Sequence, residues 1–168
     1  MSFDFVDYKK DFPLLMQQDV AYLDSAATAQ RPACVLDAER DFYQRMNANP
    51  LRGLYSLSVE ATDAIAKVRQ QIADLIGAAQ ANEVVFTRNT TEGLNLVAYS
   101  YGLSHVKAGD EILISTMEHH SNILPWQMVC CQTGAQLKFM ECEPDGSLDL
   151  NKVEALITAR TRVVALQQ

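Results

Sequence analysis

The chain has 168 residues, of which 48% are apolar, and this is enough for the core of one ordinary globular domain. The 14 basic and 21 acidic side chains give a formal net charge of −7, without any run of five or six Lys or Arg. Nucleic acid is therefore not expected as a partner, because binding a phosphate backbone needs a basic surface. The amino end lacks the pattern of a secretory leader and no apolar stretch could cross a bilayer, so we expect a cytoplasmic protein with no membrane partner.

Three helices are predicted in the first half of the chain. Apolar residues recur at spacings of three and four, which predicts an amphipathic helix over about Ser58–Ile76, ended by Gly77. A second helical pattern covers Cys34–Met46. A short helix over Val6–Phe12 is expected to end at Pro13, because proline lacks the N–H that a helix interior needs.

Short apolar runs with β-branched or aromatic residues predict strands. The expected strands are Val20–Leu23, Glu83–Thr87, Glu111–Ser115, Gln136–Met140 and Arg162–Leu166. Helices are expected between the later strands, over Glu92–Tyr101, Ile123–Thr133 and Asn151–Ala159. This alternation predicts the α/β class, with right-handed crossovers and a mostly parallel sheet that carries helices on both faces. Because the sequence stops just after a strand core, without the helix that should cover it, we expect a fragment of a longer protein.

Two loops that follow expected strands carry polar side chains suited to binding, since ligands of open α/β sheets bind beyond the carboxyl ends of the strands. In the first loop, Asn89 is a candidate N-cap and Glu92 follows three residues later, the spacing of a capping box. The amides and hydroxyls of Thr90 and Thr91 at the helix start would form an anion pocket, for which phosphate is the usual ligand. A well-capped helix without a ligand gives the same pattern, and capping alone favours that simpler interpretation.

The second loop contains the adjacent histidines His119 and His120. A neutral imidazole beyond a strand end can stack on a flat heteroaromatic ring or relay a proton. A solvated or helix-capping histidine is the commoner alternative. We expect only one of the two rings to face inward, because neighbouring side chains leave the backbone in different directions.

Cys34, Cys130, Cys131 and Cys142 lack the paired spacing of a zinc site and the density of a disulfide framework. They are expected to be buried free thiols in a reducing compartment. No metal site is expected, because the three histidines do not form a recognisable ligand pattern.

Four stretches together resemble a known enzyme family. They are Tyr22–Ala27, Arg52-Gly53, Thr90–Asn95 and Met117–Trp126. They are similar to the pyridoxal-phosphate-dependent cysteine desulfurases of the second group, the SufS and CsdA type, within the class V aminotransferase superfamily. The resemblance runs nearly end to end and implies part of the large domain of a fold type I PLP-transferase. Residues 1–55 would then belong to the small domain and the substrate side, and residues 56–168 to a partial PLP-binding large domain.

The resemblance also implies roles for individual residues. Thr90 and Thr91, with Asn89, would bind the phosphate of pyridoxal 5′-phosphate. His119 would stack on the pyridine ring and assist proton transfer as a catalytic residue. On the substrate side the resemblance places Ala26, Ala27 and Arg52. The family usually has His-Arg-Gly where this chain has Leu51-Arg52-Gly53, a departure that bears on Leu51 first and on Arg52 less.

The activity implied by the resemblance is conversion of L-cysteine to L-alanine, with sulfur passed on as a persulfide for iron–sulfur cluster assembly. The partners would be L-cysteine or a related amino acid, a second copy in a homodimer, and a sulfur-acceptor protein. The family's Schiff-base lysine, its aspartate partner of the pyridine nitrogen and its persulfide cysteine would all lie beyond residue 168, so the chain alone is expected to be inactive. Alternatives are a selenocysteine lyase, a cysteine sulfinate desulfinase, or a non-catalytic fragment or scaffold of such an enzyme.

Overall fold

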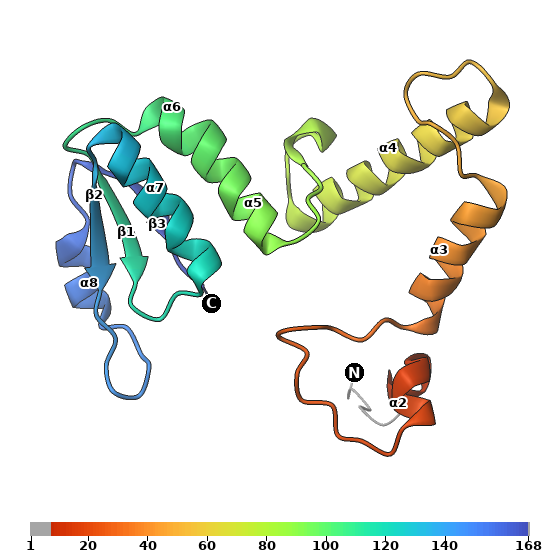
Figure 1. Ribbon diagram of the computed structural model, residues 1–168, viewed down its shortest axis with the longest axis horizontal. Coiled ribbons are helices and arrows are strands. Elements are labelled where there is room, and N and C mark those ends of the chain that lie inside the picture. Colours follow the sequence, from red (N-terminus) through yellow and green to blue (C-terminus); the bar gives the residue numbers. More distant parts are fainter. Residues whose placement is uncertain (1–7, 168) are drawn as a thin grey trace. The chain divides into compact units, whose positions relative to one another are not determined.

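A computed structural model describes residues 8–167 (Figure 1). The chain divides into two compact units, Met1–Val84 and Val85–Gln168. This division by backbone contacts falls between Val84 and Val85, whereas the domain boundary expected from the sequence lies at residues 55 and 56. That boundary concerns the domains of a longer enzyme and stays a prediction.

The first unit is helical. Its elements are η1 (Lys9–Asp11), α2 (Pro13–Gln17), α3 (Ala33–Arg45), α4 (Ser56–Ile76) and η2 (Ala81–Glu83). The two long predicted helices are confirmed, and α4 ends at Gly77, whose φ of 72° lies in the left-handed region that glycine adopts at low cost. In the described part of Val6–Phe12 the short predicted helix is present as the 3-10 helix η1, but the role expected of Pro13 is wrong. Pro13 begins a helix instead of ending one, because the first helical position has no intrahelical acceptor for an N–H.

Two predicted strands of the amino-terminal half are wrong. Within residues 8–167 neither Val20–Leu23 nor Glu83–Thr87 is paired as a strand; Glu83 ends η2, and the hydroxyl of Tyr22 donates to the carbonyl of Thr28 at 2.6 Å. Arg69 donates through Nη1 to the carbonyl of Val84 at 2.8 Å. An apolar, β-branched run predicts an extended chain, but a strand also needs a neighbour whose backbone completes the hydrogen-bond ladder.

The second unit alternates helices and strands. Its elements are α5 (Thr90–Val97), the π-helical η3 (Ala98–Gly102), α6 (Leu103–His105), β1 (Glu111–Ser115), η4 (His120–Asn122), α7 (Leu124–Thr133), β2 (Gln136–Met140), α8 (Leu150–Leu156) and β3 (Thr161–Ala165). The strands expected in this half after residue 110 are confirmed, with ends that differ by a residue at most. Within the described residues no helix is both long and apolar enough to span a membrane.

The sheet is parallel, with the order β2-β1-β3. The connection from β1 to β2 runs in one direction along the sheet, and the connection from β2 to β3 returns past β1. Two right-handed crossovers in opposite directions place their helices on opposite faces, so α7 and α8 lie on either side of the sheet (Figure 1). The predicted α/β class, with a parallel sheet and helices on both faces, is confirmed.

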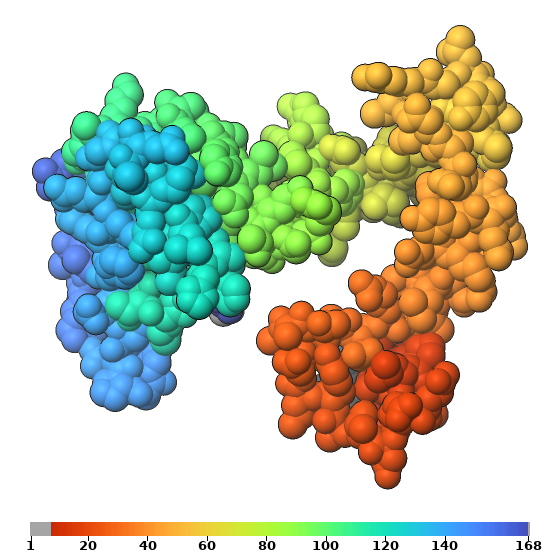
Figure 2. All heavy atoms as spheres, in the orientation of Figure 1, coloured from red at the N-terminus to blue at the C-terminus, as the bar shows by residue number. Residues whose placement is uncertain are grey.

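The core of the second unit lies between β1 and α7. Ile112 and Ile114 point to one face of β1 and pack with Trp126 and Val129 of α7, and all four side chains are at most 2% exposed. Figure 2 shows the green α5–η3 segment and the teal α7 segment as neighbouring bands of the second unit. Leu113 points to the opposite face and is equally buried. Every residue of the central strand is therefore buried, as is typical of a strand covered on both faces.

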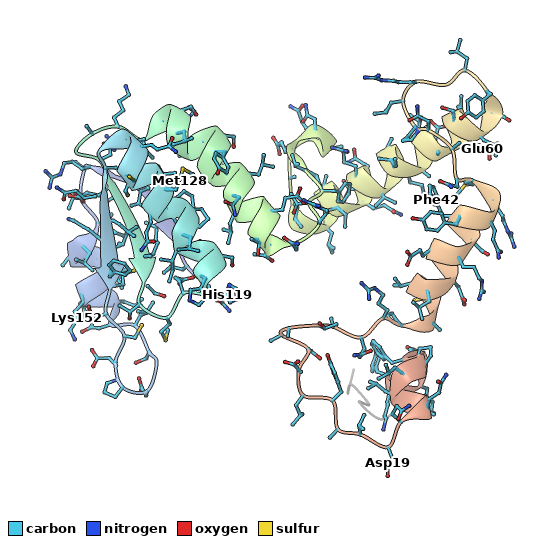
Figure 3. All side chains as sticks on the ribbon, in the orientation of Figure 1. Asp19, Phe42, Glu60, His119, Met128 and Lys152 are labelled. Atoms are coloured by element: carbon cyan, nitrogen blue, oxygen red, sulfur yellow. The ribbon has the colours of Figure 1, made fainter. Side chains whose placement is uncertain are left out.

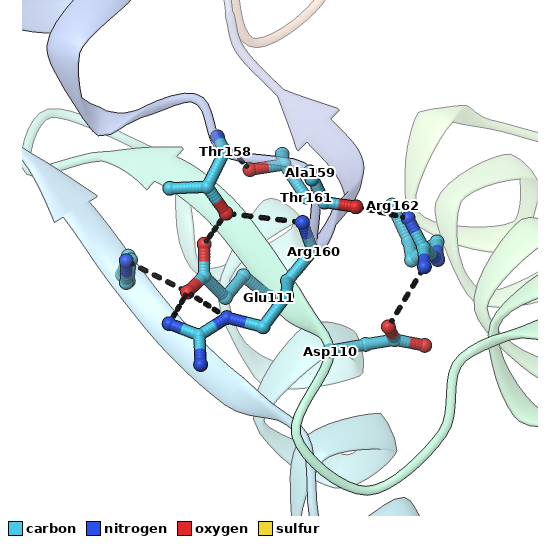
Figure 4. Close-up of polar contacts among 8 residues, drawn as sticks. Asp110, Glu111, Thr158, Ala159, Arg160, Thr161 and Arg162 are labelled. Carbon is cyan, nitrogen blue, oxygen red and sulfur yellow. Dashed lines mark hydrogen bonds and ion pairs between the residues drawn. The ribbon is translucent and has the colours of Figure 1, made fainter.

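A buried carboxylate joins the amino ends of the strands (Figure 4). Glu111, the first residue of β1, is fully buried. Its Oε2 accepts a hydrogen bond from the Thr158 hydroxyl at 2.7 Å. Its Oε1 lies 2.9 Å from Nζ of Lys138 and 2.8 Å from Nη2 of Arg160. The Thr158 hydrogen bond and then Lys138 lower the pKa of Glu111 to about 2, against the opposing effect of burial.

Candidate functional site

The start of α5 is fixed by the two side chains that the sequence singled out. Asn89 is the N-cap, and its Oδ1 accepts a hydrogen bond from the backbone N–H of Glu92 at 2.9 Å. The carboxylate of Glu92 reaches back to the backbone N–H of Arg88 at 2.6 Å, one residue before the position expected for a capping box. The N-cap prediction is confirmed, while the reciprocal half of the box is shifted by one residue.

The first turn of α5 has amides that point out of the helix. Among residues 8–167 the N–H groups of Thr90 and Thr91 donate to no backbone or side-chain acceptor, as expected for the first residues of a helix. The amino end of a helix also carries the positive end of its dipole. Two amides and two hydroxyls at this position form a donor set suited to a phosphate or carboxylate.

His119 is fixed by the backbone that follows it. It is the N-cap of η4, and its Nδ1 accepts a hydrogen bond from the backbone N–H of Ser121 at 3.1 Å. The hydroxyl of Ser121 lies 2.8 Å from the same nitrogen. A backbone N–H can only donate, so Nδ1 is the unprotonated nitrogen and a neutral ring carries its proton on Nε2. The ring therefore has one defined tautomer, with Nε2 available to a ligand.

A hollow of about 370 Å³ joins these two loops within the second unit. This volume is in the range of small-molecule sites. Its lining residues come from α5 with η3 and from η4 with α7: Thr91, Asn95, Tyr99, His119, His120, Ser121, Leu124, Pro125 and Met128. Figure 3 shows His119 just before the start of α7 and Met128 farther along that helix. The fold thus brings Thr91 and His119, which are 28 positions apart in the sequence, to the same hollow.

The prediction that only one of the adjacent histidines faces inward is wrong. His119 and His120 both line the hollow, with ring centroids 5.8 Å apart and ring planes at 73°. The backbone of His119 is extended, whereas His120 begins the 3-10 turn. This bend between the two residues brings both rings to the same side.

Sequence reasoning missed Asn95 and Tyr99, which also line the hollow. They lie four and eight positions after Thr91, and residues at this spacing share one face of a helix. The side-chain Nδ2 of Asn95 donates to the carbonyl of Thr91 at 2.8 Å. The helical spacing could have placed both residues beside Thr91 before the structure was known.

Arg52 lies in the first unit, in a loop fixed by hydroxyls of α4. The backbone N–H of Leu51 donates to Oγ1 of Thr62 at 2.8 Å, and that of Gly53 donates to Oγ of Ser58 at 3.0 Å. A Cβ on Gly53 would lie 2.4 Å from the same Oγ, so only glycine allows this approach. The loop therefore holds both neighbours of Arg52, and its expected substrate role stays a prediction.

Leu51, where the sequence departs from the resemblance, has a φ of 72° and is 80% exposed. A left-handed conformation is unfavourable for a branched side chain. Ala26 and Ala27 also lie in the first unit, in an exposed turn in which the N–H of Ala27 donates to the carbonyl of Asp24 at 3.2 Å. Their expected substrate role stays a prediction as well, because the hollow is built from the second unit alone.

The four cysteines are free, as predicted, but they are not all buried. Cys130 and Cys142 are half-buried, whereas Cys34 and Cys131 are exposed. Burial raises the pKa of the Cys130 thiol. The error arises because apolar character alone does not decide on which face of α3 or α7 a cysteine lies. Across the described part of the chain, no three His, Cys, Asp or Glu side chains gather as metal ligands would.

The model of the aminotransferase class-V family matches residues 21–168. The chain belongs to this family. A cysteine desulfurase of Enterobacter sp. (strain 638) is 49% identical over 172 aligned residues, which cover 100% of this chain and 42% of that relative. The class V chain thus spans about two fifths of the length of the curated relatives it matches.

Solved structures agree with the class V assignment. The apo cysteine desulfurase of Thermococcus onnurineus NA1 is 40% identical with a TM-score of 0.87, over 99% of this chain and 40% of that one. The cysteine desulfurase CsdA of Escherichia coli is 35% identical with a TM-score of 0.80, over 98% of this chain and 41% of that one. The fold and family implied by the resemblance in the sequence are confirmed.

Proposed function

We propose that this chain is part of a pyridoxal-phosphate-dependent cysteine desulfurase, which converts L-cysteine to L-alanine and passes the sulfur on as a persulfide. The observation that carries the proposal is the convergence of Thr91 and His119 on one hollow at the carboxyl end of the sheet. The 49% identity to a relative named cysteine desulfurase supports the substrate class.

The start of α5 and the lining of the hollow fit the cofactor, with Thr91 belonging to both and Asn89 and Thr90 lying outside the lining. A phosphate needs several N–H or O–H donors, and Thr90 and Thr91 offer two amides and two hydroxyls at the positive end of the α5 dipole. A flat pyridine ring needs an aromatic or apolar surface, and His119 with Leu124 and Met128 supplies one. When bound, pyridoxal phosphate acts as an electron sink for the carbon to which the substrate amine is attached.

The residues of this chain would bind, orient and relay a proton. Thr91 would hold the phosphate end, so that the ring lies at a fixed distance from α5. His119 would stack on the ring and move a proton through Nε2, because Nδ1 is already occupied by Ser121. Asn89 would act through the helix start that it caps.

The proposed substrate contacts, oligomeric state, compartment and sulfur acceptor follow from the resemblance to the cysteine desulfurases. Ala26, Ala27 and Arg52 would contact the substrate, and the loop that holds Arg52 from both sides supports a positioned guanidinium. A homodimer in the cytoplasm that delivers sulfur to an acceptor protein for iron–sulfur cluster assembly would complete the function.

The test is to purify the protein that contains this chain with pyridoxal phosphate and to measure alanine released from L-cysteine. Cysteine sulfinate and selenocysteine serve as competing substrates in the same assay. We expect cofactor absorbance and alanine formation, with L-cysteine the preferred substrate. If the protein binds the cofactor but turns over cysteine sulfinate or selenocysteine faster than L-cysteine, the proposed substrate is wrong. If the protein binds no cofactor, the whole proposal is overturned.

A further inference from the structure

A row of buried polar side chains alternates along the sequence with residues that line the hollow. Nε1 of Trp126 donates to Oδ1 of Asn122 at 2.9 Å, and Nδ2 of Asn122 donates to Oε2 of Glu118 at 2.7 Å. The three residues are spaced four apart and are 2%, 6% and 8% exposed. None of them lines the hollow. We call this row the buried ladder.

The direction of every hydrogen bond in the buried ladder is fixed. The indole N–H of Trp126 can only donate, so Asn122 must accept with its oxygen and donate with its nitrogen. Glu118 must therefore accept at Oε2. Its Oε1 accepts from the hydroxyl of Ser115 at 2.5 Å and from the backbone N–H of Gln167 at 3.0 Å.

Only an ionised carboxylate matches this arrangement, because every neighbour presents a hydrogen. The hydroxyl of Ser115 donates to Glu118 and also accepts from the backbone N–H of Met117 at 3.3 Å. Burial raises the pKa of Glu118, but the hydrogen bonds from Ser115, Asn122 and Gln167 outweigh it and the net shift is downward. An amide at this position would place its NH₂ against another donor.

The carboxylate of Glu118 joins three parts of the fold at the carboxyl edge of the sheet. Ser115 ends β1, Gln167 follows β3, and Asn122 ends η4, the turn that His119 caps. The backbone N–H of Asn122 also donates to the carbonyl of His119 at 2.8 Å. The orientation of the imidazole therefore depends on a turn whose far end is held by Glu118.

We propose that Glu118 is the positioning residue of His119. By accepting hydrogen bonds from Asn122, Ser115 and Gln167, it holds the turn in which Ser121 donates to Nδ1, and thus fixes the ring to one orientation and one tautomer. The relevance to catalysis rests on the proposed function, but the effect on the ring does not.

The first test variant is Glu118→Gln, which keeps shape and removes one acceptor. Its matched partner is the double variant Glu118→Gln with Asn122→Asp, in which the acid and the amide exchange places. The introduced carboxylate at position 122 accepts from the Trp126 indole and from the amide at 118, and that amide's oxygen accepts from Ser115 and Gln167. The exchange therefore restores every hydrogen bond of the buried ladder without restoring Glu118.

The readout is the ¹⁵N spectrum of the histidine rings in cofactor-free protein, with the His119 signals assigned by their loss in His119→Ala. In the wild type we expect one protonated and one unprotonated ring nitrogen for His119. In Glu118→Gln the ¹⁵N signals of these two nitrogens should move toward each other. In the exchanged double variant both signals should return to their wild-type values. Unchanged His119 signals in Glu118→Gln, or no return in a folded double variant, would overturn the proposal.

If Glu118→Gln does not fold, Trp126→Phe takes its place, because it keeps the aromatic packing and removes only the N–H. The His119 signals must then move in the same direction, and unchanged signals would count against the proposal. Because no cofactor is present in these measurements, a protein that binds no pyridoxal phosphate leaves the inference on Glu118 intact. If the enzyme binds pyridoxal phosphate but the His119 signals do not move in the variants, the inference on Glu118 is wrong and the proposed function still stands.

Discussion

The two ends of β1 each have a buried glutamate, and the two carboxylates are satisfied in different ways. Glu111 at the amino end meets two cations and a hydroxyl, all from its own sheet and from the turn before β3 (Figure 4). Glu118 lies three residues beyond the carboxyl end, and its partners within residues 8–167 are all neutral donors. At the amino end charges are paired with each other, whereas at the carboxyl end the donors of Thr91 and His119 remain directed to a hollow.

The amino end of β1 therefore contributes to the stability of the sheet, and the carboxyl end carries the donors that can bind a ligand. Loops that follow the strands of a parallel sheet meet at its carboxyl edge, where helix amino ends also point. Donors at that edge can serve a ligand only if the polar groups beneath them are satisfied by other partners. The buried ladder does this for the turn of His119, and the ion pairs of Glu111 hold the other edge together.

The largest effect is expected for His119→Ala at the carboxyl end. Turnover of L-cysteine by the complete enzyme should fall by about 10²–10⁴-fold, because a positioned acid–base group is lost. The absorbance of the bound cofactor should also change, since its ring loses a stacking partner. Alanine formation and the cofactor spectrum measure both effects.

His120→Ala is the matched control for this variant. Its ring lines the same hollow, but among residues 8–167 it has no hydrogen bond that fixes it as Ser121 fixes His119. We expect little change in the cofactor spectrum. A silent His119→Ala beside an inactive His120→Ala would assign the role to the other ring.

At the amino end, Glu111→Gln should lower stability and leave the cofactor spectrum unchanged. The pKa of Glu111 is lowered from 4.5 to about 2, so its ionised form stabilises the fold fully above about pH 4.5. This contribution is lost as the pH falls from 4.5 toward 2. The difference in unfolding free energy between wild type and variant should therefore shrink over that interval in urea titrations.

Glu143→Gln is the control, because it removes an exposed ion pair with Lys152 and such pairs contribute little. If Glu111→Gln lowers the unfolding free energy no more than Glu143→Gln does, the ion pairs of Glu111 do not stabilise the amino end of the sheet as proposed.

A smaller effect is expected for Asn89→Ala, which removes the cap of α5. Loss of an N-cap costs about 1 kcal/mol of stability, and here it should also weaken cofactor binding because the amides of the first turn lose their fixed direction. Asp149→Ala is matched to it, since Asp149 caps α8 by accepting from the N–H of Asn151 at 3.0 Å. Equal losses of cofactor affinity in both variants would show that the cap acts through general stability.

Much of the second unit could be predicted from the sequence, because its elements carry strong local signals. Glu111–Ser115 is an apolar run of strand length, and Asn89 stands three residues before Glu92 at a helix start. Val20–Leu23 carries a similar apolar signal and forms no strand, because pairing depends on residues that are distant in the sequence. Pro13 begins α2 although the sequence predicts that it ends a helix, because proline is compatible with both positions.

The candidate site was predictable in its residue types but not in its geometry. The sequence indicated Thr91 and His119 separately, and only the crossovers around β1 bring them to one hollow. Glu118, Asn122 and Trp126 lie at a helical spacing that was visible in the sequence. The partners that complete the carboxylate of Glu118 are Ser115 at the end of β1 and Gln167 after β3, which are distant from each other in the sequence.

The most direct test of a phosphate site at the start of α5 is to measure the affinities of pyridoxal phosphate and pyridoxal for wild type and Thr91→Ala. The two ligands share the ring and the aldehyde and differ only in the phosphate. Loss of one charge-assisted hydrogen bond corresponds to about 1.5–3 kcal/mol, roughly ten- to a hundredfold in affinity. We predict this loss for pyridoxal phosphate and no change for pyridoxal, whereas equal effects on both ligands, or none on either, would contradict a phosphate site at the start of α5.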